Sequence, residues 1–138
     1  MQKYTMTASI IYEGDLRCRA THLQSGTVTE TDAPTDNRGK GEKFSPTDTL
    51  CVSLATCLIT TMALKARDME IELKDTKIDV VKHMLKDPRR VAQIDVTLHF
   101  PALQLSEDQK SVLETAGNNC PVAKSLHPDL IMNIKYIW

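Results

Sequence analysis

The stretch from Ser45 to Met69, SPTDTLCVSLATCLITTMALKARDM, most constrains what this chain can fold into. Ser45 before Pro46 predicts a helix start, because a serine oxygen accepts from a free backbone N–H and proline at the first helical position loses no hydrogen bond. Asp48 adds negative charge to the first turn, where the helix dipole favours it. Apolar or small residues follow at spacings of three and four: Leu50, Leu54, Cys57, Leu58, Thr61 and Leu64. We therefore expect one long helix, buried along most of its length.

The composition is that of an ordinary globular chain of 138 residues, 41% hydrophobic and 25% charged. This length predicts a single domain over residues 1–138 with one core. The formal net charge of −1 and the 4% aromatic content argue against a nucleic-acid partner. The sequence shows only short uninterrupted apolar runs and an N-terminus unlike a signal peptide, so we expect no membrane partner and a cytoplasmic location.

Strand and turn signals fill the chain before the helix. Residues 3–12 are rich in Thr, Ile and Tyr and predict a strand, with a turn at Glu13-Gly14-Asp15. The segment LRCRATHL predicts a second strand, with Arg17 and Arg19 on the face opposite Leu16, Cys18 and Ala20. After a turn at Ser25-Gly26, TVTETDA predicts a third antiparallel strand, and the polar residues 34–44 predict an exposed loop.

The chain after the long helix mixes strands and helices. Residues 71–85 predict a strand, Asp87-Pro88 a turn, and VAQIDVTLHF a half-buried antiparallel strand whose odd-numbered residues, Val91 to His99, face away from its even-numbered ones. Ser106 and Gln109 form a capping box before a helix with Val112, Leu113 and Ala116 inward. A short helix should begin at Pro121, and LIMNIKYIW should close as a strand. The fold class is therefore α+β with an antiparallel sheet, and so apolar a helix favours a second subunit as cover.

The four cysteines are expected to be reduced thiols, because their spacing lacks the pattern of a disulfide scaffold. Cys18 and Cys51 are best explained as small packed residues. Cys57 and Cys51 point to different sides of the helix, and Cys57 taken alone is also more often core than catalyst. Cys120 precedes Pro121 at a helix start, where free N–H groups and the dipole favour a thiolate. Cys120 is therefore the cysteine that local physics marks as reactive.

Other chemistries find less support in the sequence. No CxxC or HExxH motif is present, and the four histidines are scattered, so we expect no metal site. A cysteine hydrolase would need a histidine base such as His127, seven residues after Cys120, but its neighbours Pro128 and Asp129 fit a loop.

Two motifs resemble those of the OsmC/Ohr family. SPTDTLCVSLATCLITTMAL resembles the central helix of that family, in which a Ser/Asn-Pro start leads to a cysteine among small residues, and NNCPVAKSL resembles its second cysteine motif. GDLRCRATHLQSG resembles a hairpin of the family's small bacterial branch. The resemblance covers essentially the whole chain. It implies an OsmC-like fold in which three N-terminal, two central and one C-terminal strand wrap around a long central helix, as an intertwined homodimer.

The resemblance also implies a function: a thiol-dependent peroxidase that reduces organic or lipid hydroperoxides. By position, Cys57 would be the peroxidatic cysteine, Cys120 the resolving cysteine, and Arg17 the activating cation, with Arg19 as a second candidate on the same strand face. The Cys57–Cys120 disulfide would be reduced by an external dithiol, lipoyl-linked in many family members, with no bound cofactor.

One departure from the family concerns the acid that holds the arginine. The hydroperoxide-resistance branch carries a glutamate directly after the helix-start proline, whereas Thr47 stands there in this chain and Asp48 follows. One residue turns a helical side chain by about 100°. Asp48 is therefore expected either to cap the helix or to hold Arg17. The alternative function is a non-catalytic or weakly active dimer that binds a small apolar ligand beside the central helix.

Overall fold

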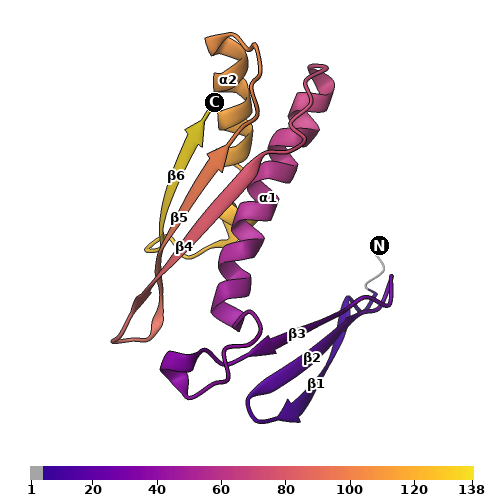
Figure 1. Cartoon of the computed structure of the whole chain (residues 1–138), viewed down its shortest axis with the longest axis vertical. Coiled ribbons are helices and arrows are strands. Elements are labelled where there is room, and N and C mark those ends of the chain that lie inside the picture. Colours follow the sequence, from indigo (N-terminus) through magenta and orange to yellow (C-terminus); the bar gives the residue numbers. More distant parts are fainter. Residues whose placement is uncertain (1–4) are drawn as a thin grey trace. The chain divides into compact units, whose positions relative to one another are not determined.

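The computed structural model describes residues 5–138. These residues form two compact units with their boundary between Thr49 and Leu50, unit 1 before it and unit 2 from Leu50 to Trp138. The single domain over residues 1–138 stays a prediction. The strands form two separate three-stranded sheets, one in each unit (Figure 1).

Unit 1 is a meander of three antiparallel strands in the order β1-β2-β3. The strands are β1 (Ala8–Gly14), β2 (Arg17–His22) and β3 (Val28–Asp32), as the strand and turn signals predicted; residues 3 and 4 of the first predicted strand lie outside the described residues. Asp15 and Leu16 form the first turn, both with positive φ, and Gly26 lies in the second. A 3₁₀ turn, η1 (Thr35–Asn37), interrupts the predicted loop.

Unit 1 has almost no apolar interior of its own. Its buried residues are polar: Asp32, 1% exposed, and Ser45, 1% exposed. Large hydrophobic side chains on β1 are instead open to solvent, with Ile10, Ile11 and Tyr12 all more than 60% exposed. A three-stranded sheet without a covered hydrophobic face is marginally stable.

The long helix α1 (Pro46–Asp68) matches the predicted span within one residue at each end. Its start is capped as predicted: the Ser45 hydroxyl accepts from the Asp48 N–H at 3.0 Å, and the Asp48 carboxylate accepts from the Ser45 N–H at 2.9 Å. Each side chain thus satisfies a backbone donor of the other residue. The predicted cap therefore fixes where the helix begins.

The face of α1 that is buried differs from the predicted one. Leu50 and Leu64 are 36% and 59% exposed, and the buried residues are Cys51, Leu54, Ala55, Leu58, Met62 and Ala66. Both faces of this helix carry small and apolar residues, so spacing alone selected a face rotated from the real one. By length and composition α1 could cross a membrane, but its apolar character equally suits a core helix, and its buried face supplies part of the unit 2 core.

The sheet of unit 2 has the order β4-β5-β6, with β4 (Lys77–Leu85), β5 (Arg90–His99) and β6 (Ile131–Ile137). β4 pairs antiparallel with β5, but β6 runs parallel to β5, which corrects the fully antiparallel sheet that was predicted. A register shift near Ala92 leaves Val91 buried together with Ile94, although strict alternation predicted opposite faces for these two residues.

Two shorter helices complete unit 2. α2 (Glu107–Asn118) starts with the predicted capping box between Ser106 and Gln109, and α3 (Pro121–Ser125) starts at the predicted proline. Leu113 is fully buried in the core, as predicted, whereas Val112 is 41% exposed, so its predicted inward position was wrong. The core is built mainly from α1 and β5, and α2 contributes Leu113. Figure 1 shows α1 and α2 beside the sheet of unit 2.

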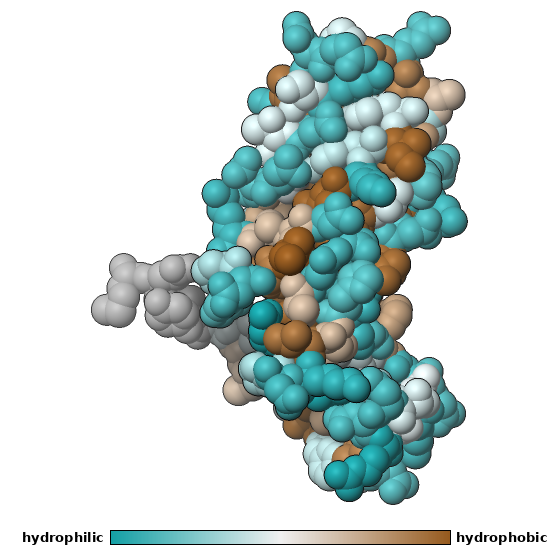
Figure 2. All heavy atoms as spheres, turned by 90° about the vertical axis from the view of Figure 1, so that its left-hand side faces the viewer, coloured by the Kyte–Doolittle hydropathy of each residue, from teal (hydrophilic) through white to brown (hydrophobic). Residues whose placement is uncertain are grey.

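The outer face of the unit 2 sheet carries a polar cluster around Asp95 among exposed hydrophobic residues. Asp95 accepts hydrogen bonds from Gln93 and Asn133 and lies 2.7 Å from the His83 ring nitrogen. These hydrogen bonds, led by the one from Gln93, lower the pKa of Asp95 from 3.8 to about 2. Figure 2 views the side of the molecule that carries β6 in Figure 1 and shows hydrophilic residues with scattered hydrophobic ones, as expected for a solvated face.

Candidate functional site

Two cysteines of unit 2 come together from distant parts of the chain. Cys57 lies near the middle of α1 and is partly exposed, while Cys120 is fully buried between α2 and α3. The two side chains interact: a hydrogen bond to Cys57 and the charge of a Cys57 thiolate both act on the Cys120 thiol. The structure therefore brings together the two cysteines that the sequence singled out. Both are free thiols here.

Burial controls the proton of Cys120. Cys120 is the N-cap of α3, and its sulfur accepts from the Ala123 N–H at 3.5 Å, as its position before Pro121 predicted. This bond favours the thiolate, but burial is the larger influence and, with the contribution of Cys57, raises the pKa of Cys120. The expectation that the helix start would leave a net preference for thiolate was therefore wrong. Burial therefore holds the proton on Cys120 more tightly than on an ordinary thiol.

In unit 1, a buried carboxylate holds Arg17. The Arg17 Nε and Nη2 atoms donate to the two Asp32 oxygens at 2.7 and 2.8 Å, a bidentate pair. Asp32 also accepts from the Glu42 N–H at 3.2 Å, and its pKa is lowered, chiefly by the Arg17 hydrogen bond. Glu42 and Glu30 lie 3.5 and 3.9 Å from the guanidinium. Arg17 is therefore fixed in orientation among three acids, and the same pair raises its own pKa.

The remaining predicted site residues do not hold Arg17 in the structure. Asp48 caps α1, so of the two expected roles it takes the capping one. Thr47 lies 3.1 Å, oxygen to oxygen, from the Ser45 hydroxyl at the same helix start. Arg19 is exposed on β2 and lies opposite Ile11 and Glu30 in the sheet. Arg17 belongs to unit 1 and Cys57 to unit 2.

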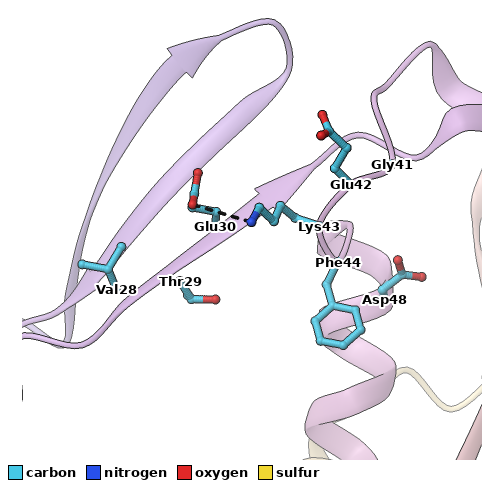
Figure 3. Close-up of a pocket in the computed structure, with 8 residues that line it drawn as sticks. All are labelled: Val28, Thr29, Glu30, Gly41, Glu42, Lys43, Phe44 and Asp48. Carbon is cyan, nitrogen blue, oxygen red and sulfur yellow. Dashed lines mark ion pairs between the residues drawn. The ribbon is translucent and has the colours of Figure 1, made fainter.

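An open hollow of about 630 Å³ lies within unit 1, between β3 and the segment that leads into α1. Half of its lining residues are charged, and Figure 3 shows Lys43 reaching Glu30, the two paired at 4.0 Å, while the Phe44 ring lies near Asp48 at the helix start. Three acids and one lysine give the hollow a net negative lining. Its lining residues include no cysteine.

The other two cysteines and His127 occupy packed or loop positions. Cys51 is 2% exposed and packs in the core, and Cys18 is half-buried in β2, in agreement with packing roles. His127 lies in an exposed loop, where its Nδ1 accepts from the Asp129 N–H at 3.0 Å. Within residues 5–138, no group of three or more His, Cys, Asp or Glu side chains is arranged to hold a metal ion.

Sequence reasoning missed Asp32, although the sheet register would have found it. In the structure Arg17 pairs directly with Asp32 across β2 and β3. The hairpin closes between His22 and Thr27, whereas counting outward from the predicted Ser25-Gly26 turn would have paired Arg17 with Pro34. Because the predicted turn lay one residue too late in the sequence, the predicted register did not pair Arg17 with Asp32.

Comparisons with known proteins place this geometry in a family. A family model described as OsmC-like protein matches residues 39–135. A solved protein from Psychrobacter arcticus, named provisionally for osmotic stress induction and detoxification response, is 44% identical over 98% of both chains, with a TM-score of 0.92. A comparison with curated proteins gives no match.

More distant solved structures share the fold. An organic hydroperoxide resistance protein OsmC from Legionella pneumophila is 15% identical over 99% of this chain and 100% of its own, with a TM-score of 0.72. An organic hydroperoxide resistance protein from Elizabethkingia anophelis is 14% identical over 99% and 97%, also at 0.72. The family model matches well over half of the length of this chain, and the fold and the two neighbouring cysteines agree with it. The chain therefore belongs to the OsmC-like protein family.

Proposed function

We propose that this protein is a thiol-dependent peroxidase for organic hydroperoxides, with Cys57 as the peroxidatic and Cys120 as the resolving cysteine. The direct interaction of these two side chains, 63 residues apart in sequence, carries the proposal. The family includes proteins named for organic hydroperoxide resistance, which supports the same chemistry.

The proposed reaction has three balanced steps. The Cys57 thiolate attacks the O–O bond, so that the hydroperoxide leaves as an alcohol and Cys57 becomes a sulfenic acid. The Cys120 thiol then displaces the sulfenic oxygen, which leaves as water, and a Cys57–Cys120 disulfide forms. An external dithiol reduces this disulfide by exchange and is itself oxidised. A lipoyl-linked dithiol in the cytoplasm is the reductant that the family resemblance suggests.

The contact between the thiols suits this order of events. Burial, and to a lesser degree the charge of a Cys57 thiolate, raises the pKa of Cys120, so the resolving thiol is held in its protonated form before peroxide arrives. A sulfenic acid carries no such charge at neutral pH. Oxidation of Cys57 therefore removes one of the influences that suppress ionisation of Cys120, and the second step becomes easier only after the first.

Arg17 is proposed as the cation that activates Cys57, a role carried over from the family. A mid-helix cysteine gains little from the dipole, which acts mainly within the first turn, so a nearby cation is needed. In this chain Asp32 would orient that cation, because it binds the guanidinium through both oxygens. Asp48 would support the site by fixing the start of α1.

A homodimer is proposed to cover the surfaces that the single chain leaves open. Besides Leu50 and Leu64, α1 exposes Thr56 and Thr60, and Thr56 directs its hydroxyl back to the Val52 carbonyl at 2.9 Å. A hydroxyl satisfied within its own helix can be buried against a second helix at little cost. The exposed hydrophobic residues of β1 also need cover. Sedimentation at micromolar protein should show a dimer, and monomer alone would refute this part.

Substitution of each cysteine tests the proposed activity. Cys57→Ser should abolish consumption of cumene hydroperoxide in the presence of a dithiol, because no thiolate remains to attack. Cys120→Ser should still react once and should accumulate a sulfenic acid that dimedone traps. Cys18→Ser is the matched control, and it should turn over as the unsubstituted protein does. Equal turnover by Cys57→Ser and the unsubstituted protein would defeat the proposal.

The alternative, a non-catalytic dimer that binds an apolar ligand, has one observation in its favour. A mostly apolar groove of about 420 Å³ lies beside α1, lined by Lys65 together with Ser111, Val112, Thr115 and Ala116 of α2. If this alternative holds, peroxide treatment would leave Cys57 and Cys120 without a disulfide. Val112→Glu would weaken binding of an apolar fluorescent probe, whereas substitution of the cysteines would leave that binding unchanged.

A further inference from the structure

Tyr136 on β6 reaches across unit 2 to the end of α2. Its hydroxyl donates to the Asn118 side-chain oxygen at 2.6 Å, and it also lies 3.3 Å from the Glu114 carbonyl oxygen. The ring is held from the other side, because Phe100 stacks on it with 6.4 Å between ring centroids and on Trp138 at 3.8 Å. The Tyr136 hydroxyl is therefore fixed against the last turn of α2.

Gly117 shows how close this approach is. A Cβ atom added to Gly117 would lie 2.8 Å from Leu58, 2.9 Å from Met62 and 3.0 Å from the Tyr136 hydroxyl oxygen. Any larger residue would push these groups apart. Leu58 directly follows Cys57 on α1, so the same point of contact joins the peroxidatic helix, α2 and β6.

A short backbone link connects this contact to Cys120. The Cys120 N–H donates to the Gly117 carbonyl at 3.1 Å, and the Asn119 side chain donates to the Thr115 carbonyl at 2.8 Å. The position of the Cys120 sulfur is therefore set by the turn that begins at Gly117. The Tyr136 hydroxyl contacts that turn directly.

We propose that Tyr136 is a positioning residue for the resolving step: its hydroxyl pins the C-terminal turn of α2 so that the Cys120 sulfur stays beside Cys57. The inference rests on the proposed function, because it assigns Cys120 the resolving role. Tyr136 acts through Asn118 and the Gly117 turn and does not touch the reacting atoms in this assignment.

The ionisation of Tyr136 agrees with this role. Burial, then the charge of Glu114, then that of Cys120 raise the pKa of Tyr136 to about 12. The phenol therefore remains a hydrogen-bond donor across the pH range in which thiols react. The charge on Cys120 also acts on Tyr136, which agrees with a phenol that lies near the resolving sulfur.

The test is Tyr136→Phe, which removes only the hydroxyl. Equilibration with reduced and oxidised glutathione measures the effective concentration of Cys57 and Cys120 toward each other, without peroxide. We expect this value to fall about fivefold, since one lost hydrogen bond of about 1 kcal/mol loosens the turn. In rapid mixing with peroxide, sulfenic acid formation should keep its rate while disulfide formation slows by a similar factor.

Controls separate positioning from general destabilisation. Asn118→Ala should reproduce the effect, and the double variant should be no worse than either single one, because both remove the same bond. Tyr12→Phe, on the exposed β1 strand, should leave both measurements unchanged. An effective concentration for Tyr136→Phe within twofold of the unsubstituted value would overturn the inference.

The two proposals fail in distinguishable ways. If the unsubstituted protein forms the glutathione-driven disulfide but no sulfenic acid with peroxide, the peroxidase proposal fails and the effective concentration still decides the role of Tyr136. If no Cys57–Cys120 disulfide forms under either oxidant, both fail together.

Discussion

The two units of this chain are organised by opposite means. Every buried hydrophobic residue in the described part of the chain belongs to unit 2, whose core joins α1, β5 and α2. Unit 1 buries Asp32 and Ser45 and is organised by the Arg17–Asp32 pair and the hydrogen bonds around it. The difference indicates that unit 2 stabilises itself, whereas unit 1 orients a charged group and depends on further cover for its apolar face.

The largest effect on stability is expected for a substitution in the core of unit 2. Leu58→Ala, at a fully buried position of unit 2, should cost about 2–5 kcal/mol of unfolding free energy, because it removes apolar contacts and leaves a cavity. Denaturant unfolding measures this loss. A loss below about 1 kcal/mol would contradict a self-sufficient unit 2 core.

Ile11→Ala is the matched substitution in unit 1, at a side chain that is 66% exposed in the single chain. In dilute monomer it should change stability by no more than about 0.5 kcal/mol. A larger loss that grows with protein concentration would show that a second copy covers β1, as the proposed dimer requires.

The second largest effect concerns activity and the polar clamp of unit 1. Asp32→Asn removes the charge that orients Arg17, and we expect kcat/KM for hydroperoxide to fall about tenfold or more, as misplaced catalytic groups commonly cause. Glu42→Gln is the control, because Glu42 is exposed and lies 3.5 Å from Arg17. Equal activity of Asp32→Asn and Glu42→Gln would show that Asp32 does not orient Arg17 for catalysis.

The lowered pKa of Asp32 also predicts how the stability of the protein changes in acid. Its pKa is lowered in the folded protein, so its contribution to stability is present above its unfolded pKa and is lost as pH falls through the folded value. In Asp32→Asn the stability should depend less on pH below about 4. A pH dependence of unfolding identical to that of the unsubstituted protein would contradict the Arg17–Asp32 pair.

The smallest effect is expected on the solvated sheet of unit 2. The pKa of Asp95 is lowered from 3.8 to about 2, so Asp95 contributes stability above its unfolded pKa that is lost as pH falls between these values. Asp95→Asn should therefore flatten the acid branch of the stability curve and leave peroxide consumption unchanged at neutral pH. Thermal unfolding across the acid range is the measurement, and an unaltered acid branch would speak against the network around Asp95.

The parts of the fold that depend on local chemistry were predictable. Ser45-Pro46, the Ser106–Gln109 box and Cys120-Pro121 each mark a helix start by hydrogen bonds within a few residues, and all three are confirmed. The sequence also singled out the two cysteines that the fold brings together, although their spacing could not show that they meet.

What was not predictable depends on contacts between distant segments. Alternation gives a strand its faces but not its direction, so the parallel β5-β6 pair was missed. A bulge near Ala92 moved Val91 to the buried face, and α1 offered two apolar faces of which only tertiary packing selects one. Asp32 and Tyr136 were missed for the same reason, since each acts on a residue far away in sequence.

The central claim is that Cys57 and Cys120 form one redox pair, and mass spectrometry after peroxide tests it most directly. The reduced protein is treated with one equivalent of cumene hydroperoxide, denatured and alkylated. The account predicts that two of the four cysteines escape alkylation and that proteolysis yields a peptide joining Cys57 to Cys120. Four alkylated cysteines after peroxide, or a disulfide that involves Cys18 or Cys51 instead, would contradict it.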